Sequence, residues 1–290
     1  MREALYYKMI EELAHCQLCP RSCIISEGNF GFCRSRKLIN GKLIATAYGQ
    51  TVSIAKDPIE KKPLYHYHPH SQIVSLGPNA CNLNCAFCQN WEISQQDTIT
   101  QAVKISQLAA YVRGMNPCQV AFTYSEPTMW YEFIWDFAVY APDVEIVLVT
   151  NGYLNPLPWQ ALLPKIKAIN IDLKSIRNDF YKRLCGGDAE IVKANIISAF
   201  QAGVHVELTN LLIPGENDSE AELHELAKFV ASINPNIPLH ISAYRPCYKM
   251  NNRATDKAEI EAACEIAAKY LKHVYAGNVL STRYGRHQRT

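Results

Sequence analysis

The chain has 290 residues, of which 48% are hydrophobic and 19% are charged, and its formal net charge at pH 7 is +2. These values are typical of one globular α/β domain, alone or with a small appendage, and they give no reason to expect binding to nucleic acid or to an anionic membrane. No apolar run reaches the roughly 18 to 20 residues that a membrane-spanning helix needs, and residues 1–5 lack an apolar signal core, so we expect a cytoplasmic protein.

Residues 1–70 are expected to form a small N-terminal segment. Over residues 2–15, Leu5, Ile10 and Leu13 lie among charges at roughly helical spacing, which predicts a short amphipathic helix. Residues 42–56 alternate apolar and polar side chains on either side of Gly49-Gln50, which predicts a β-hairpin.

The 11 cysteines of the chain are grouped, and seven of them fall within residues 16–33 and 81–88. In a protein without a secretion signal, such grouping favours metal ligands over disulfides. The first group is Cys16, Cys19, Cys23 and Cys33. Four thiolates suit either zinc or an iron–sulfur cluster, and unligated cysteines in a loop are the third alternative.

A segment rich in charge, proline and histidine follows at residues 57–70. Asp57–Leu64 contains prolines at positions 58 and 63, so it is expected to be extended or turning. His66, His68 and His70 would share one face of an extended strand and could bind a transition metal. The simpler interpretation, which we prefer, is a polar linker over the mouth of the next domain.

From residue 72 onward, short apolar runs alternate with helical patterns. The predicted strands are 73–76, 119–124, 145–150, 168–173, 205–213 and 238–244. The predicted helices lie near 103–115, 128–140, 157–166, 189–202, 219–233 and 257–271. This alternation is typical of βαβ units and a parallel sheet. Six units are too few to close an eight-stranded barrel, so we predict an α/β fold, a partial (β/α)6 TIM-type barrel over residues 71–280.

The second cysteine group has the spacing Cys81-x3-Cys85-x2-Cys88. Iron–sulfur clusters are usually held by four thiolates, so three on one loop predict a cubane cluster with one iron open to a non-protein ligand. Phe87, an aromatic residue just before the third cysteine, could shield the cluster from water. The alternatives are a zinc knuckle or three buried thiols that lie together by chance.

Polar or glycine-bearing sequences follow or end each predicted strand, where parallel β/α folds place their chemistry. They are Gly77–Ala80 with the cysteine loop, Ser125-Glu126-Pro127, Asn151-Gly152-Tyr153, Asp172 with Lys174, Pro214–Asp218, and His240. Six such signals at equivalent positions predict a single site at one mouth of the barrel.

The sequence resembles the radical S-adenosylmethionine (SAM) superfamily, and within it the radical SAM protein of the AmmeMemoRadiSam system, which is similar to pyruvate formate-lyase activating enzyme. The resemblance covers nearly the whole chain. It rests on Cys16–Cys23, Asp57–Leu64, Cys81–Ser94, Tyr124–Thr128, Val149–Tyr153, Asp172–Lys174, Phe180–Gly187 and Gly277–Val279.

The resemblance implies that the open iron of a [4Fe-4S] cluster binds SAM through its amino and carboxylate groups. It places Ser125 and Glu126 at the SAM amino group, Asp172 and Lys174 near the SAM carboxylate, and His240 in contact with SAM. Asn151 joins this cofactor-binding set. A lysine opposite a carboxylate is electrostatically sensible, and a surface ion pair is the alternative for Asp172 and Lys174.

Three departures separate this chain from the activating enzymes. Val149 stands where an aspartate often does, which removes one proposed ligand of a monovalent cation. The ferredoxin-like insert of two-domain activases is missing, and residues 281–290 form a basic tail in place of a second Cys-x2-Cys pair. We expect that tail to be disordered.

The leading hypothesis is a radical SAM oxidoreductase that cleaves SAM reductively to a 5′-deoxyadenosyl radical, with a flavodoxin or ferredoxin as electron donor. Its substrate could be the glycine of a glycyl-radical protein, a peptide, a small molecule or an RNA base, and the near-neutral charge disfavours RNA. The alternative from another class is a zinc-stabilised, non-catalytic binding protein.

Overall fold

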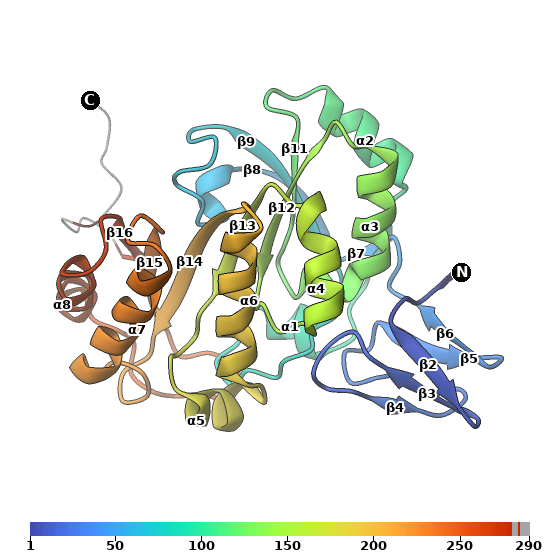
Figure 1. Ribbon diagram of the computed structural model, residues 1–290, viewed down its shortest axis with the longest axis horizontal. Helices are drawn as coiled ribbons and strands as arrows, with labels where there is room; N and C mark the ends of the chain where they lie inside the picture. The colour runs from blue at the N-terminus through green and yellow to red at the C-terminus, as the bar shows by residue number, and fades with distance from the viewer. Residues whose placement is uncertain (280–283, 285–290) are drawn as a thin grey trace.

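The computed structural model describes residues 1–279 and residue 284 and contains a central eight-stranded sheet (Figure 1). The order across the sheet is β16-β15-β14-β13-β12-β11-β9-β8, in which β8 is antiparallel to β9 and the other neighbours are parallel. The strands are β8 (Ser53–Pro58), β9 (Gln72–Gly77), β11 (Gln119–Phe122), β12 (Glu145–Thr150), β13 (Ala168–Asp172), β14 (His205–Leu212), β15 (Leu239–Ala243) and β16 (Val274–Gly277).

Helices connect the parallel strands and form an outer layer (Figure 1). They are α1 (Trp91–Gln95), α2 (Ile105–Arg113), α3 (Tyr131–Tyr140), α4 (Pro156–Leu162), α5 (Asn178–Phe180), α6 (Ala189–Gln201), α7 (Glu220–Ile233) and α8 (Lys257–Ala268). The predicted partial (β/α)6 barrel is confirmed. The sheet gains β8 at one edge and β16 at the other, neither of which the prediction counted.

The central strands are short and mostly apolar. Both faces of the parallel sheet are covered, so the side chains on either face of a strand are buried. All four residues of β11 are buried, and so are the first four of β13. Trp130 and Trp159, each at most 1% exposed, fill the space between the sheet and its helices.

The predicted helix over residues 2–15 is wrong, because this stretch forms strands β1 (Arg2–Glu3), β2 (Tyr7–Ile10) and β3 (Leu13–Cys16). In the β2–β3 hairpin Ile10 faces Leu13 across a two-residue turn. Along β3 every second side chain is buried: Ala14 and Cys16 are buried, and Leu13 and His15 are partly exposed. Sparse apolar residues matched a helical spacing by chance, and burial of Cys16 beside the other cysteines requires the strand.

The predicted hairpin over residues 42–56 is also wrong. Strand β6 (Lys42–Ala45) pairs with β5 (Arg36–Ile39) across Asn40-Gly41, and both turn residues have positive φ. Asn-Gly is the strongest two-residue hairpin signal, because a type I′ turn requires positive φ at both central positions. The remaining short strands are β4 (Ile24–Ile25), β7 (Gln50–Thr51) and β10 (Gln101–Ala102).

Residues 65–68 lie at the amino ends of the parallel strands, opposite the end where the cysteine loop follows β9. The backbone N–H groups of Tyr65 and His66 donate to Glu207 of β14 at 3.0 and 2.7 Å. His66, His68 and His70 contact Tyr275, Glu145 and Glu60 respectively, so they do not converge on one metal. The polar linker is therefore present, but it covers the amino end of the barrel.

The N-terminal appendage docks against α3, beside the barrel (Figure 1). Buried Arg36 pairs with buried Glu132, and Arg2 pairs with Asp136 at 3.0 Å. Within the described residues, none of the helices combines the length and apolarity needed to cross a membrane. The predicted tail at 281–290 lies, apart from residue 284, outside the described residues.

Candidate active site

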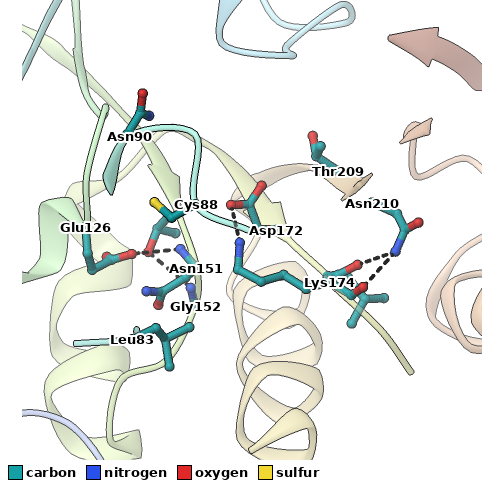
Figure 2. A network of polar contacts seen from close by, with 12 residues as sticks. Leu83, Cys88, Asn90, Glu126, Asn151, Gly152, Asp172, Lys174, Thr209 and Asn210 are labelled. Atoms are coloured by element: carbon teal, nitrogen blue, oxygen red, sulfur yellow. Dashed lines mark hydrogen bonds and ion pairs between the residues drawn. The ribbon is translucent and has the colours of Figure 1, made fainter. Parts of the chain in front are cut away.

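A cavity of about 610 Å³ opens at the carboxyl ends of the parallel strands. Eight of the predicted site residues line it together: Cys81, Cys85, Cys88, Ser125, Glu126, Asn151, Asp172 and Lys174. They come from the loop after β9 and from the ends of β11, β12 and β13. Figure 2 shows Glu126 and Asn151 on one side of this region and Asp172 with Lys174 on the other.

The cysteine loop is held by backbone hydrogen bonds to the turn of π-helix at Tyr181–Cys185. The N–H groups of Asn84 and Ala86 donate to the carbonyls of Cys185 and Leu184 at 3.0 and 2.8 Å. Buried Asn82 donates to the carbonyl of Tyr153 and accepts a hydrogen bond from Asn151. The loop is thus fastened on two sides before any cofactor binds.

The three thiols occupy different environments. Burial raises the pKa values of Cys81 and Cys88, while a hydrogen bond with Cys185 lowers the pKa of Cys85. Thiolates are the form that binds iron, so cofactor binding must release protons from Cys81 and Cys88. Sequence reasoning missed Cys185, which is buried and reaches the site from a helix far along the chain.

Glu126 lies in the cavity wall, and its carboxylate is already hydrogen-bonded within the protein. It accepts hydrogen bonds from the N–H and hydroxyl of Thr128, the hydroxyl of Thr150 and the N–H of Asn151, at 2.6 to 3.0 Å. Burial raises its pKa, and these hydrogen bonds oppose that rise. The side chain therefore supports the strand ends, and it has little capacity left for a SAM amino group.

Asp172 and Lys174 form an ion pair at 2.9 Å at the end of β13 (Figure 2). Burial would lower the pKa of Lys174, but the Asp172 carboxylate and the nearby thiols raise it well above its ordinary value. Lys174 is therefore a cation in the cavity wall. Phe87 packs beside it, with the ammonium 5.9 Å from the ring centre.

His240 is not brought together with the other predicted residues. Its imidazole is buried and contacts Glu207 at 2.7 Å, and it does not line the cavity. Ser242, two residues farther along β15, lines the cavity in its place. The structure therefore does not bring His240 to the cavity as predicted, because His240 lies near the amino end of β15, two residues before Ser242.

Sequence reasoning also missed the side of the cavity that residues before the barrel supply. Asp57, Lys61 and Lys62 line it, and Tyr124, which follows β11, lies against Lys62 there. Lys62 is 4% exposed and pairs with Asp57 at 2.9 Å, and its burial lowers its pKa. The available signal was the segment Asp57–Lys62, which carries four charges and precedes the first predicted barrel strand in the chain.

The four N-terminal cysteines, Cys16, Cys19, Cys23 and Cys33, line a second, small cavity in the appendage. In the part of the chain that is described, no three His, Cys, Asp or Glu side chains are arranged to hold a single metal ion. Each cysteine group surrounds a cavity instead. The cavity beside Cys81, Cys85 and Cys88 has room for a cluster, whereas the cavity beside the N-terminal cysteines has a volume of only about 10 Å³.

Comparison with known proteins gives a family match. The family model described as the radical SAM superfamily matches residues 77–230, just over half of the chain. The chain is 41% identical over 288 residues to an uncharacterized protein of Methanocaldococcus jannaschii, covering 96% of this chain and 86% of the relative. It is 26% identical to GTP 3′,8-cyclase of a Sulfurovum species over 48% of this chain and 45% of that enzyme.

Two solved structures resemble the fold at low sequence identity. A radical SAM methyltransferase from Sphaerobacter thermophilus matches with a TM-score of 0.56 at 16% identity, over 72% of this chain and 67% of that one. Streptococcus suis SuiB bound to S-adenosylmethionine matches with a TM-score of 0.55 at 15% identity, over 69% of this chain and 48% of that one. At these identities the likeness is one of fold.

Proposed function

This chain belongs to the radical SAM superfamily, and we propose that it cleaves SAM reductively and uses the resulting 5′-deoxyadenosyl radical to abstract hydrogen from a substrate. The family uses a [4Fe-4S] cluster and SAM. The observation that carries the proposal is the meeting of Cys81, Cys85 and Cys88 with polar strand ends around one cavity.

Cys81, Cys85 and Cys88 would hold the cluster, and Phe87, 3% exposed, would shield it from water. When bound, the cluster supplies one electron that breaks the bond between the sulfonium sulfur and C5′ of SAM. Lys174, a partly buried cation, would face the SAM carboxylate. Ser125 holds its hydroxyl against the carbonyl of Pro78, which leaves the backbone around Ser125 and Glu126 to orient the SAM amino group.

We place the substrate at the opposite side of the cavity, beside Asp57, Lys61, Lys62 and Tyr124. A volume of about 610 Å³ lies in the range of roughly 300 to 1,000 Å³ that is typical of ligand pockets. These residues offer a buried ammonium, a carboxylate and an aromatic face to a polar substrate. The glycine of a glycyl-radical protein, a peptide and a small molecule are the substrate classes to test there.

The test is anaerobic turnover with SAM and a flavodoxin or dithionite, with 5′-deoxyadenosine measured by mass spectrometry. The wild type should form 5′-deoxyadenosine, and Cys85→Ala should not, because one of three protein bonds to the cluster is lost. Cys118→Ala is the matched control, since Cys118 lines neither cavity. Undiminished product from Cys85→Ala would contradict the proposal.

Substrate identification follows from the same assay. Candidate peptides and small molecules labelled with deuterium should transfer the label to 5′-deoxyadenosine if they are the substrate. The alternative of a zinc-stabilised binding protein makes the opposite prediction, a colourless protein that contains zinc and leaves SAM intact.

A further inference from the structure

One wall of the large cavity carries more positive than negative charge. Asp57, near the end of β8, pairs through Oδ1 with Lys61 at 3.2 Å and through Oδ2 with Lys62 at 2.9 Å, and all three residues line the cavity. Burial would raise the pKa of Asp57, but the two lysines lower it, so this group is a carboxylate. Two ammonium groups around one carboxylate leave one positive charge uncompensated in this wall.

Lys62 is a buried ammonium that has hydrogen-bond donors left for a ligand. Burial lowers its pKa, and the hydrogen bond to Asp57 opposes that change. An ammonium has three N–H donors, and Asp57 is its one hydrogen-bond acceptor among the described residues. Because Asp57 already serves both lysines, the remaining donors of Lys62 are available to an acceptor bound in the cavity. Lys61 differs, since its side chain is 66% exposed and can be solvated by water.

Tyr124 lies against the same ammonium in an unusual backbone conformation. Its φ of 73° is in the left-handed region, which bulky residues rarely adopt, and such conformations persist mainly at functional sites. The ring centre is 4.8 Å from Nζ of Lys62, and the hydroxyl is 3.4 Å from Oδ2 of Asp57. Burial raises the pKa of Tyr124, so the ring adds no negative charge beside the ammonium. The aromatic face shields the cation but does not neutralise it.

The charge and the size of this wall favour a small carboxylic acid. A single uncompensated charge matches the carboxylate, which carries one negative charge at neutral pH, better than a phosphate group, which carries nearly two. A glycine inside a protein chain has no carboxylate, because its carboxyl group forms a peptide bond. The same cavity of about 610 Å³ must also hold SAM, so the space that remains is that of a small molecule.

We propose that the substrate is a small carboxylic acid whose carboxylate binds the ammonium of Lys62 beside the ring of Tyr124. Asp57 fixes the position of that ammonium, and the exposed Lys61 attracts an anion towards the cavity. The identification of this acid as the substrate rests on the proposed function, whereas the carboxylate-binding site itself does not.

The first experiment measures the binding of matched probes by isothermal titration calorimetry, with the reconstituted enzyme saturated with SAM so that Lys174 is occupied. N-acetylglycine and benzoate carry a carboxylate. N-acetylglycinamide and benzamide are their neutral amides, and N-acetylglycinamide also resembles a glycine inside a protein chain. The wild type should bind each acid at least about tenfold more tightly than its amide, because the amide lacks the charge that pairs with Lys62. Equal binding of acid and amide, or tighter binding of inorganic phosphate, would overturn the proposal.

The second experiment assigns the preference for acids to Lys62. Lys62→Met should bind both acids about ten- to hundredfold more weakly, and Lys62→Arg, which keeps the charge, should retain part of the preference. Lys193→Ala, an ion-paired lysine that does not line the cavity, is the control and should bind the acids like wild type. An unchanged preference for acids in Lys62→Met would overturn the proposal.

A measurement on the wild type keeps the test decisive if Lys62→Met misfolds. Acetic anhydride acetylates lysine side chains, and mass spectrometry reports the extent of labelling at each one. N-acetylglycine should slow the labelling of Lys62, whereas N-acetylglycinamide should not. Equal labelling of Lys62 with the two probes would contradict the proposed site.

Failure of this proposal and failure of the proposed function are distinguishable. A protein that cleaves SAM to 5′-deoxyadenosine but shows no preference for acids retains the proposed function and loses the carboxylate-binding site. A protein that prefers acids through Lys62 but neither binds nor cleaves SAM retains the carboxylate-binding site and loses the proposed function, and with it the identification of the acid as a substrate.

Discussion

The buried carboxylate of Glu126 accepts a hydrogen bond at 2.8 Å from the backbone N–H of Asn151, which ties the end of β11 to the end of β12. Asn151 in turn donates to Asn82 at 2.9 Å and lies 3.8 Å from Sγ of Cys81. A carboxylate that was expected to bind the cofactor is therefore a support for the loop that holds it.

Replacing Glu126 by Gln should destabilise the protein by about 1 to 3 kcal/mol. The carboxylate accepts hydrogen bonds through both of its oxygens, and the amide nitrogen of Gln, itself a donor, would replace one of them. Thermal unfolding of the cofactor-free protein measures this loss. Glu190→Gln, on the exposed side of α6, is the matched control and should leave the unfolding temperature unchanged. Equal unfolding temperatures for Glu126→Gln and wild type would show that the hydrogen bonds are not needed.

Replacing Lys174 by Ala should weaken SAM binding by roughly ten- to hundredfold, since a hydrogen bond to a charged group contributes about 1.5 to 3 kcal/mol. The visible spectrum of the reconstituted cluster should not change, because Lys174 is not an iron ligand in this proposal. Equilibrium binding of SAM to the reconstituted variant gives the measurement. Lys193→Ala, which removes an ion-paired lysine of α6 away from the cavity, is the control and should bind SAM like wild type. Normal SAM binding by Lys174→Ala would show that Lys174 does not contact SAM.

The stability of the protein should fall in acid partly through Glu207. Burial would raise the pKa of Glu207, but hydrogen bonds from His205 and His240 lower it from 4.5 to about 2. A carboxyl with a depressed folded pKa stabilises the fold above its unfolded pKa, and this stabilisation is lost as pH falls from 4.5 towards 2. The full contribution is about 3 kcal/mol.

Urea unfolding of wild type and Glu207→Gln at several pH values tests this assignment. The variant should be less stable near neutral pH, and the difference between the two proteins should shrink as pH falls below 4.5. Glu12→Gln, in the exposed β2–β3 turn, should follow the wild type throughout. A difference that stays constant with pH would mean that Glu207 contributes through packing rather than charge.

Gly77 is required where β9 passes β11. A Cβ atom at this position would lie 1.9 Å from the backbone carbonyl oxygen of Thr123, and neither strand can move without disturbing the cysteine loop. Gly77→Ala should therefore cost about 1 to 3 kcal/mol of stability, as overpacking does. It should also lower the iron content after reconstitution, whereas Gly114→Ala, at the end of α2, should retain its iron.

The barrel was predictable because its signals are local and repeated. Buried strands such as β11 and β13 are rich in apolar residues, and helices with buried apolar side chains follow them in the chain. The appendage was not predictable by the same means. Its strands are two to four residues long, and they are stabilised by contacts such as Arg36 with Glu132, which lie 96 residues apart.

The site could be predicted where residues follow a strand directly, and the prediction failed where the position along a strand decides. His240 and Ser242 lie on the same strand, but only Ser242 lines the cavity. Residues i and i+2 of a strand point to the same face, so the two differ in depth, and His240 lies nearer the amino end of β15 than Ser242. Lys62 was missed for another reason, since its partner Asp57 and the ring of Tyr124 meet it only after the linker folds back against the sheet.

The linker across the amino ends of the strands has a consequence for how the chain folds. Tyr65 and His66 find their acceptor, Glu207, 142 and 141 residues later in the sequence. This part of the linker must therefore wait for β14 to be synthesised before it can take its final position. Closing such a long loop costs chain entropy before its contacts can form. This step of folding should therefore be slow and should come late in synthesis.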